Sequence, residues 1–313
     1  MNKLINNSIN QHFISRVEQK FNSINGGKKQ IYKFEIEDKR YSILKGPEIN
    51  DINGSKNGAL FYKYLYSFKK SGDMNHNFEI IFQSYENEIK NLTETILDLK
   101  DKQKICTENL KKLFAVKFLN CLRNPYSIKG TIKTFYKNIN KILPINTCPP
   151  KDYKEIMKNE NLPYIFSNIG ISIDIYNKWI EILFLMLVNF EKSNGNIFDK
   201  IIEMIFKNNI VSINICRYDE RATGNCLLSD KGYIYYKTNN EIFSKYAFNL
   251  SSNCFVNYEL IFIDNQSKKL YKGGIEDTIN VFQNDIPKLK MYNKDVIKYS
   301  YKNIYSNSKN ILI

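Results

Sequence analysis

Histidine and arginine are scarce in this chain. Its 313 residues include two histidines, His12 and His76, and 46 lysines and arginines, of which only five are arginine. Two histidines give too little to define a Ser-His-Asp or Cys-His catalytic order. Lysine, asparagine and isoleucine are abundant, as in proteins from AT-rich genomes, so the arginines are the more informative cations.

Zinc-type cysteine spacing and long apolar runs are also missing. None of the six cysteines forms a C-x-x-C pair or has a histidine near it in the sequence, so we expect reduced thiols and assign no metal site. The strongest apolar run, residues 179–190, is about half the length that a bilayer requires. The first residues contain no continuous apolar stretch of the kind found in a signal peptide. We therefore expect a cytoplasmic protein with no membrane association.

Hydrophobic and positively charged residues are well represented. Hydrophobic residues make up 43% of the chain, with 22 tyrosines and 20 phenylalanines, which is typical of globular proteins. The formal net charge is +14, and lysine-rich surfaces bind phosphate by releasing counterions. Nucleic acid is therefore one expected partner. The alternative, that base composition alone produces the excess charge, stays open.

Hydrophobic spacing predicts a β-hairpin, then a helical middle, then a strand-rich part. The expected helices are 75–104, 108–122, 174–192, 196–208 and 290–305. The expected strands are the hairpin at 28–45 and the segments 211–218, 225–230, 233–237, 245–250 and 254–263. This order predicts an α+β fold, with a central helical bundle packed with a mostly antiparallel sheet in the C-terminal half.

Prolines gather at one point of the chain. Four of the seven prolines lie within residues 144–163, which predicts an irregular connection between sub-parts 1–143 and 164–313. Because the hairpin is N-terminal and the last helix C-terminal, both ends are expected to pack on a shared body. We therefore predict a single interleaved domain spanning residues 1–313.

Two glutamates lie on one face of the long predicted helix. Glu79 and Glu86 are seven residues apart, beside the apolar stripe, where burial and mutual repulsion raise carboxyl pKa values. A solvated helix edge is the alternative. Arg123 falls at a helix end, where it can neutralise carbonyls or grip a carboxylate or phosphate. Asp230 ends a strand at a turn, a position that suits both backbone capping and catalysis.

Five short motifs, in order along nearly the whole chain, resemble the domain of unknown function (DUF) 4238 family. They are QHFI (11–14), FEIIFQSYEN (78–87), LRNPYSIK (122–129), LLSDKGY (227–233) with FNLSS (248–252), and YNKDVIKYSYKNIY (292–305). Ser15 stands where the family has proline, and Lys231-Gly232 replace its Asn-Pro. The resemblance implies that His12, Glu79, Glu86, Arg123, Asp230 and Asn293 converge on one site. It also implies a bacterial protein with an anti-phage defence role.

Two hypotheses follow, and the residues leave open whether the protein is an enzyme. In the first, a nuclease-like effector acts on nucleic acid or a nucleotide. His12 transfers protons, Arg123 grips phosphate, and Glu79, Glu86 and Asp230 orient His12 or bind a divalent cation. Arg217 and Arg221 are expected at a binding surface, together with Asn293. In the second, the same cluster is a buried network in a non-enzymatic recognition or inhibitor module, whose partner is a phage or host protein or nucleic acid.

Overall fold

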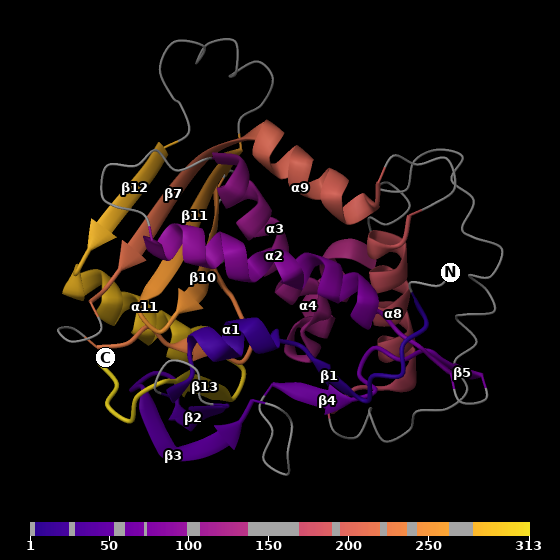
Figure 1. Cartoon of the computed structure of the whole chain (residues 1–313), viewed down its shortest axis with the longest axis horizontal. Helices are drawn as coiled ribbons and strands as arrows, with labels where there is room; N and C mark the ends of the chain where they lie inside the picture. The colour runs from indigo at the N-terminus through magenta and orange to yellow at the C-terminus, as the bar shows by residue number, and fades with distance from the viewer. Residues whose placement is uncertain are drawn as a thin grey trace.

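The protein is described by a computed structural model that covers residues 4–24, 29–52, 60–71, 74–98, 107–136, 169–189, 195–219, 224–236, 243–262 and 278–313. The predicted connection at 144–163 and Arg221 lie outside these described residues. Helices and strands are mixed along the chain, and a mostly antiparallel sheet occupies its C-terminal half (Figure 1). The predicted α+β fold class is confirmed.

The helices agree with the prediction in the middle of the chain and differ at two ends. They are α1 (Arg16–Phe21), α2 (Glu79–Asp98), α3 (Thr107–Arg123), α4 (Ile128–Thr131), α8 (Ile173–Leu187), α9 (Ile197–Asn208) and α11 (Ile286–Tyr299), with a 3-10 turn at Pro125–Ser127 and a π turn at Ile132–Tyr136. The helix expected at 75–104 begins only at Glu79, because Met74–His76 pairs as a strand. The helix expected at 290–305 begins earlier, at Ile286, and ends at Tyr299. Asp285 is its N-cap, and the Asp285 side chain accepts a hydrogen bond from the Lys288 amide.

In the described residues, the strands form four sheets. The strands are β1 (Asn10–His12), β2 (Gln30–Asp38), β3 (Ile43–Asp51), β4 (Phe61–Lys63), β5 (Lys69–Ser71), β6 (Met74–His76), β7 (Asn209–Arg217), β8 (Leu228–Ser229), β9 (Ile234–Tyr236), β10 (Phe243–Ser251), β11 (Cys254–Phe262), β12 (Thr278–Gln283) and β13 (Asn303–Ser306). The largest sheet has the order β12-β7-β11-β10-β9, in which only the β12 pairing is parallel. Two further sheets are the pairs β1-β4 and β5-β6.

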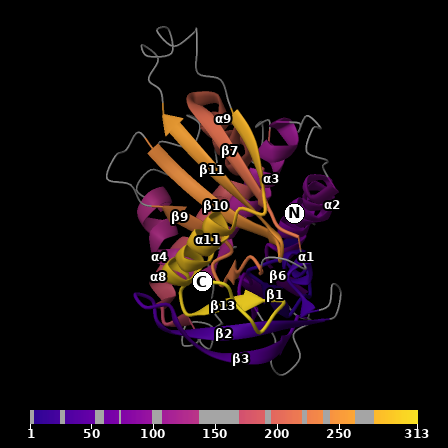
Figure 2. The same cartoon turned by 90° about the vertical axis from the view of Figure 1, so that its left-hand side faces the viewer.

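The fourth sheet joins the two ends of the chain. Its order is β3-β2-β13-β8, and the register places Ile304 opposite both Phe34 and Ser229. Residues expected to end a terminal helix therefore form a central strand between the N-terminal hairpin and β8. Figure 2 shows this sheet below the five-stranded sheet, with α11 between them.

Helices cover both faces of the five-stranded sheet. On one face, Phe114 of α3 contacts the rings of Tyr246, Phe248 and Tyr258 edge to face, at centroid distances of 5.0 to 5.8 Å. On the other face, Tyr292 of α11 stacks on Phe255 at 4.0 Å. Alternate side chains of the strands thus feed two separate hydrophobic cores.

Residues 179–187 of the apolar segment form most of the helix α8, which is largely buried. Trp179 in α8 is fully buried, and its indole N–H donates to the carbonyl of Leu122 at 2.7 Å. Among the helices in the described part of the chain, none combines the length and apolar character needed to cross a membrane.

Candidate functional site

The site begins at the N-terminus of α1, where the sequence has Ser15 in place of the expected proline. Ser15 forms a capping box with Glu18: the Ser15 hydroxyl accepts from the Glu18 amide at 3.1 Å, and the Glu18 carboxylate accepts from the Ser15 amide at 3.2 Å. A proline could not donate this second hydrogen bond. Ser15 thus fixes the start of the helix and the position of a buried carboxylate.

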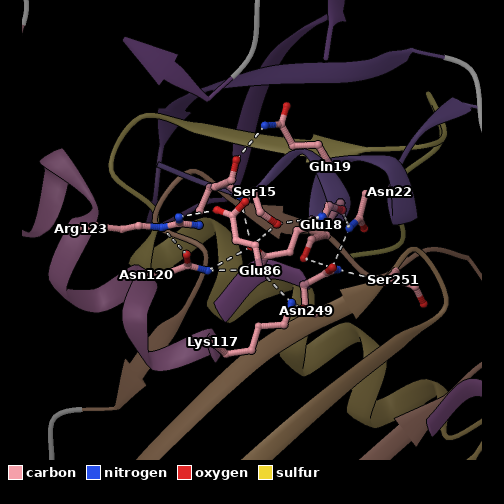
Figure 3. A network of polar contacts seen from close by, with 12 residues as sticks. Ser15, Glu18, Gln19, Asn22, Glu86, Lys117, Asn120, Arg123, Asn249 and Ser251 are labelled. Atoms are coloured by element: carbon pink, nitrogen blue, oxygen red, sulfur yellow. Dashed lines mark hydrogen bonds and ion pairs between the residues drawn. The ribbon is translucent and has the colours of Figure 1, made fainter. Parts of the chain in front are cut away.

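Glu18 and Lys117 form a buried ion pair (Figure 3). The Lys117 ammonium donates to Glu18 at 2.8 Å and to the Asn249 carbonyl at 2.7 Å, and both charged side chains are buried. Asn120 donates a further bond to Glu18 at 3.1 Å. Burial on its own would raise the pKa of Glu18, but Lys117 outweighs burial and lowers it.

Arg123 and Glu86 form a second ion pair, next to the first. The Arg123 guanidinium donates to Glu86 and, at 3.1 Å, to the amide oxygen of Asn120. It also lies over the ring of Phe82, 5.2 Å from the centroid. Burial raises the pKa of Glu86, and Arg123 limits the rise. Because Arg123 is itself buried and held on three sides, it positions Glu86 rather than facing a ligand.

Glu79 lies in the first turn of α2 and, unlike Glu18 and Glu86, forms no ion pair among the described residues. Its Oε1 atom is buried and has no hydrogen-bond partner in the described structure. Burial, with repulsion from Glu86, raises the pKa of Glu79 to about 8. The side chain therefore carries a proton at neutral pH, so it can donate that proton.

His12 lies at the end of β1, which pairs with β4 opposite Phe61. Its side chain is 7% exposed, and Nε2 accepts a hydrogen bond from Nε of Arg16 at 3.4 Å. Burial, together with the charge of Arg16, lowers the pKa of His12 to about 4. The imidazole is therefore neutral at neutral pH, with one nitrogen able to accept a proton.

The structure thus brings together four of the residues predicted from the sequence. His12, Glu79, Glu86 and Arg123 come from β1, α2 and α3, and the charges of Arg123 and exposed Arg16 act on His12 and on both glutamates. We call these four residues and Arg16 the His12 cluster. It holds a neutral base and a protonated acid whose pKa values are shifted in opposite directions, the pattern that marks acid-base pairs in enzymes.

Asp230 does not join the His12 cluster. Its carboxylate accepts from the backbone amides of Tyr301, Lys302 and Asn303 at 2.8, 2.7 and 2.8 Å. Burial raises its pKa, and these amides oppose the rise. Asp230 therefore organises the turn between α11 and β13.

The predicted binding residues Asn293 and Arg217 also lie elsewhere. Asn293 is buried in α11, where it accepts from the Leu227 amide and donates to the carbonyls of Asn225 and Leu312. Arg217, at the end of β7, donates to the Leu97 carbonyl at 2.6 Å. Both make structural contacts that tie separate segments together.

The predicted donor set for a divalent cation does not assemble. Glu79 and Glu86 are near one another, but the oxygens of Asp230 are bound to backbone amides. In the described ranges, no group of three or more His, Cys, Asp or Glu side chains has the arrangement to hold a metal ion. These residues therefore do not form a site for a divalent cation.

Sequence reasoning missed Arg16, Glu18 and Lys117. The Ser15-x-x-Glu18 spacing is the signature of a capping box and marks both residues. Lys117 falls in phase with buried Leu110, Leu113 and Phe114, so a cation on the apolar face of α3 signals a buried partner.

Comparisons with known proteins give no relatives for this site. No family model matches the chain, and no curated protein or solved structure is similar to it.

Proposed function

We propose that the protein is an enzyme that cleaves phosphodiester or phosphoanhydride bonds in nucleic acid or a nucleotide, with the His12 cluster as its active site. Glu79 carries this proposal. One oxygen of its carboxyl group is buried without a hydrogen-bond partner in the described residues, which is costly. The charges of Arg123 and Arg16 act on both Glu79 and His12, so the two groups share an electrostatic environment that suits proton transfer.

The proposed reaction uses the protonation states that the cluster holds at neutral pH. Arg16 turns from His12 to the phosphate oxygens, which frees Nε2 of His12. His12 then accepts a proton from the attacking water as the water oxygen forms a bond to phosphorus. The bond from phosphorus to the leaving oxygen breaks, and Glu79 donates its proton to that oxygen. Exposed Arg16 binds the phosphate oxygens, while Arg123 holds Glu86 beside Glu79. One cycle consumes one water. A proton then passes from His12 to Glu79, which restores the starting protonation states of both side chains.

A pH profile follows from this assignment. His12 must be neutral and Glu79 protonated, so activity is expected between the His12 pKa of about 4 and the Glu79 pKa of about 8. The rate should fall on both sides of this window.

The test is cleavage of labelled RNA, DNA and nucleoside triphosphates by purified protein, compared with the His12→Ala and Glu79→Gln variants. We expect parent activity and a loss of about a hundredfold or more in either variant, as for removal of a general acid or base. Parent activity that persists in both variants would contradict the assignment.

The biological setting belongs to the same proposal. The ordered motifs that resemble the DUF4238 family support membership in that family and a role in anti-phage defence in the bacterial cytoplasm. Expression in a phage-sensitive bacterium should lower plaque numbers, and Glu79→Gln should restore them. Equal plaque numbers with and without the parent protein would remove the defence role but leave the chemistry standing.

A recognition module without catalysis is the second candidate. The closed network of Glu18, Lys117 and Asn120 favours it, because fully bonded polar networks specify a unique core without performing chemistry. In that case His12→Ala lowers the melting temperature, the parent cleaves no nucleic acid, and the protein instead captures a phage or host partner.

A further inference from the structure

Aromatic side chains form a connected cluster that ends at the surface. Phe13 stacks on Tyr62 at a centroid distance of 5.6 Å, and the hydroxyls of Tyr62 and Tyr126 are hydrogen-bonded at 2.9 Å. Tyr126 then stacks on Tyr301 at 4.4 Å with an angle of 10° between the rings. Tyr301 is 54% exposed. Tyr126 therefore stacks on one face of the Tyr301 ring, while more than half of the residue remains exposed to solvent.

The exposed ring is rigidly placed. Its backbone amide is bound to Asp230, as are the next two amides of the turn. Asp230 in turn is fixed through its carbonyl, which accepts from Asn124 at 2.8 Å, directly before the turn that carries Tyr126. The buried Asp230 carboxylate accepts three hydrogen bonds from this exposed turn and so fixes Tyr301 against Tyr126. A tyrosine that had only to face solvent would need no such support.

Lysines from three segments lie near the turn that carries this ring. Lys302 follows Tyr301, with a 60% exposed side chain that pairs with Glu35 at 3.1 Å. Exposed Lys39 donates to the carbonyl of Ser300, directly before Tyr301, at 2.5 Å. The charge of Lys231, beside Asp230, interacts with that of Lys39. An open aromatic face among cations matches the alternation of base and phosphate in a single strand.

We propose that the stacked pair of Tyr126 and Tyr301, with Lys39, Lys231 and Lys302, is a binding platform for single-stranded nucleic acid. A nucleobase stacks on the open face of Tyr301, and the lysines contact the adjacent phosphates. Stacking tolerates any base, whereas a paired base in a duplex has no free face to offer. The inference names a substrate class for the proposed function. Only the role of the bound strand as substrate rests on that function.

The experiment is fluorescence anisotropy with a labelled single-stranded oligonucleotide of about ten nucleotides, using the whole chain. Parent protein should bind it more tightly than the duplex of the same sequence. Tyr301→Ala should weaken binding about tenfold, and Tyr301→Phe, which keeps the ring, should bind as the parent does. Lys302→Ala should make the affinity less sensitive to salt, because one phosphate contact is lost.

Tyr41→Ala is the matched control, because Tyr41 is also exposed (73%) and lies beside a cation, Arg40, and no ring among the described residues stacks on it. It should bind as the parent does. Absence of binding by the parent, unchanged binding by Tyr301→Ala, or an equal loss in Tyr41→Ala would each overturn the platform. Glu79→Gln should retain full binding, so a failure of the platform and a failure of the proposed catalysis give different results.

Discussion

Glu18 is buried and Glu79 is half-buried, and the two carboxyl groups have opposite surroundings. Glu18 receives hydrogen bonds from Lys117, Asn120 and Ser15, whereas one oxygen of Glu79 has none. The first carboxylate helps to hold the fold together. The second costs stability, a feature common in groups that are kept for function.

Replacing Glu79 by glutamine should stabilise the protein at alkaline pH. Its folded pKa is about 8, raised from 4.5, so the folded state binds the extra proton between these values. The stability from that proton is complete below about 4.5 and is lost as the pH rises through about 8. Glu79→Gln cannot ionise. Denaturant unfolding should therefore show a gain of about 1–3 kcal/mol at pH 9 and a much smaller change at pH 5.

Glu88→Gln is the control for this measurement, because Glu88 lies on the same helix and is exposed. It should change stability little at either pH. If Glu79→Gln showed the same unfolding free energy as the parent across the pH range, Glu79 would be an ordinary solvated carboxylate.

Glu18 and Lys117 should stabilise the folded protein only when both are present. Lys117→Met leaves a buried carboxylate uncompensated and should cost about 3–5 kcal/mol in unfolding free energy. Adding Glu18→Gln to that variant should recover part of the loss. The exposed pair of Lys90 and Glu94, 3.8 Å apart, is the control, and Lys90→Met should cost less than about 0.5 kcal/mol. Equal effects in the two pairs would show that the buried pair is solvated.

At the scale of elements, the turn after Asp230 brings β8 against the N-terminal segment. Gly232 has a φ of +75°, and a Cβ at that position would meet Ile14 and lie 2.9 Å from the side-chain nitrogen of Asn120. The glycine thus lets the turn approach the residues that support the His12 cluster.

Gly232→Ala should lower the unfolding free energy by about 1–3 kcal/mol, because it adds both backbone strain and a steric clash. Gly130→Ala, in α4, is the matched control, since a Cβ there meets nothing within 4 Å. It should be neutral or stabilising by up to about 1 kcal/mol. A Gly232→Ala protein as stable as the parent in thermal melts would show that the turn is free to shift.

The sequence predicted most of the long elements and the short strands β8 and β9, but it missed β1, β4, β5 and β6. Helix periodicity located α3 and α9 to within about two residues, because an apolar face repeats regularly. It extended the last helix over β13, because Ile304 and Tyr305 continue its spacing, yet their partners in β2 and β8 are distant in sequence. Parallel β12 was missed for the same reason: its neighbour β7 lies far from it in the chain.

The candidate site was predictable only in part. The family resemblance singled out His12, Glu79, Glu86 and Arg123, which the structure brings together. It also singled out Asp230 and Asn293, whose polar side chains bind backbone groups instead. A short motif does not distinguish a side chain that faces a site from one that braces a turn, because that depends on tertiary packing.

At the scale of the whole molecule, the two ends of the chain meet in one sheet. β13 pairs with β2 on one side and with β8 on the other, so the first and last parts of the chain share hydrogen bonds. If residues 1–313 form the single domain predicted, these parts should unfold together.

Unfolding in urea should therefore give one transition. Trp179 is the only tryptophan, and it is buried against α3 through Leu122, so its fluorescence reports the helical part. Far-ultraviolet circular dichroism reports all elements. The two midpoints should coincide. Two separated transitions would indicate two domains that unfold independently, as sub-parts 1–143 and 164–313.

The most direct test of the His12 cluster measures activity and stability on one variant. Glu79→Gln should lose cleavage of labelled single-stranded nucleic acid by about a hundredfold or more, while its unfolding free energy at alkaline pH rises above that of the parent. This combination identifies a group kept for chemistry at the expense of stability. Full cleavage by the variant, or a loss of cleavage that merely follows a loss of stability, would contradict the account.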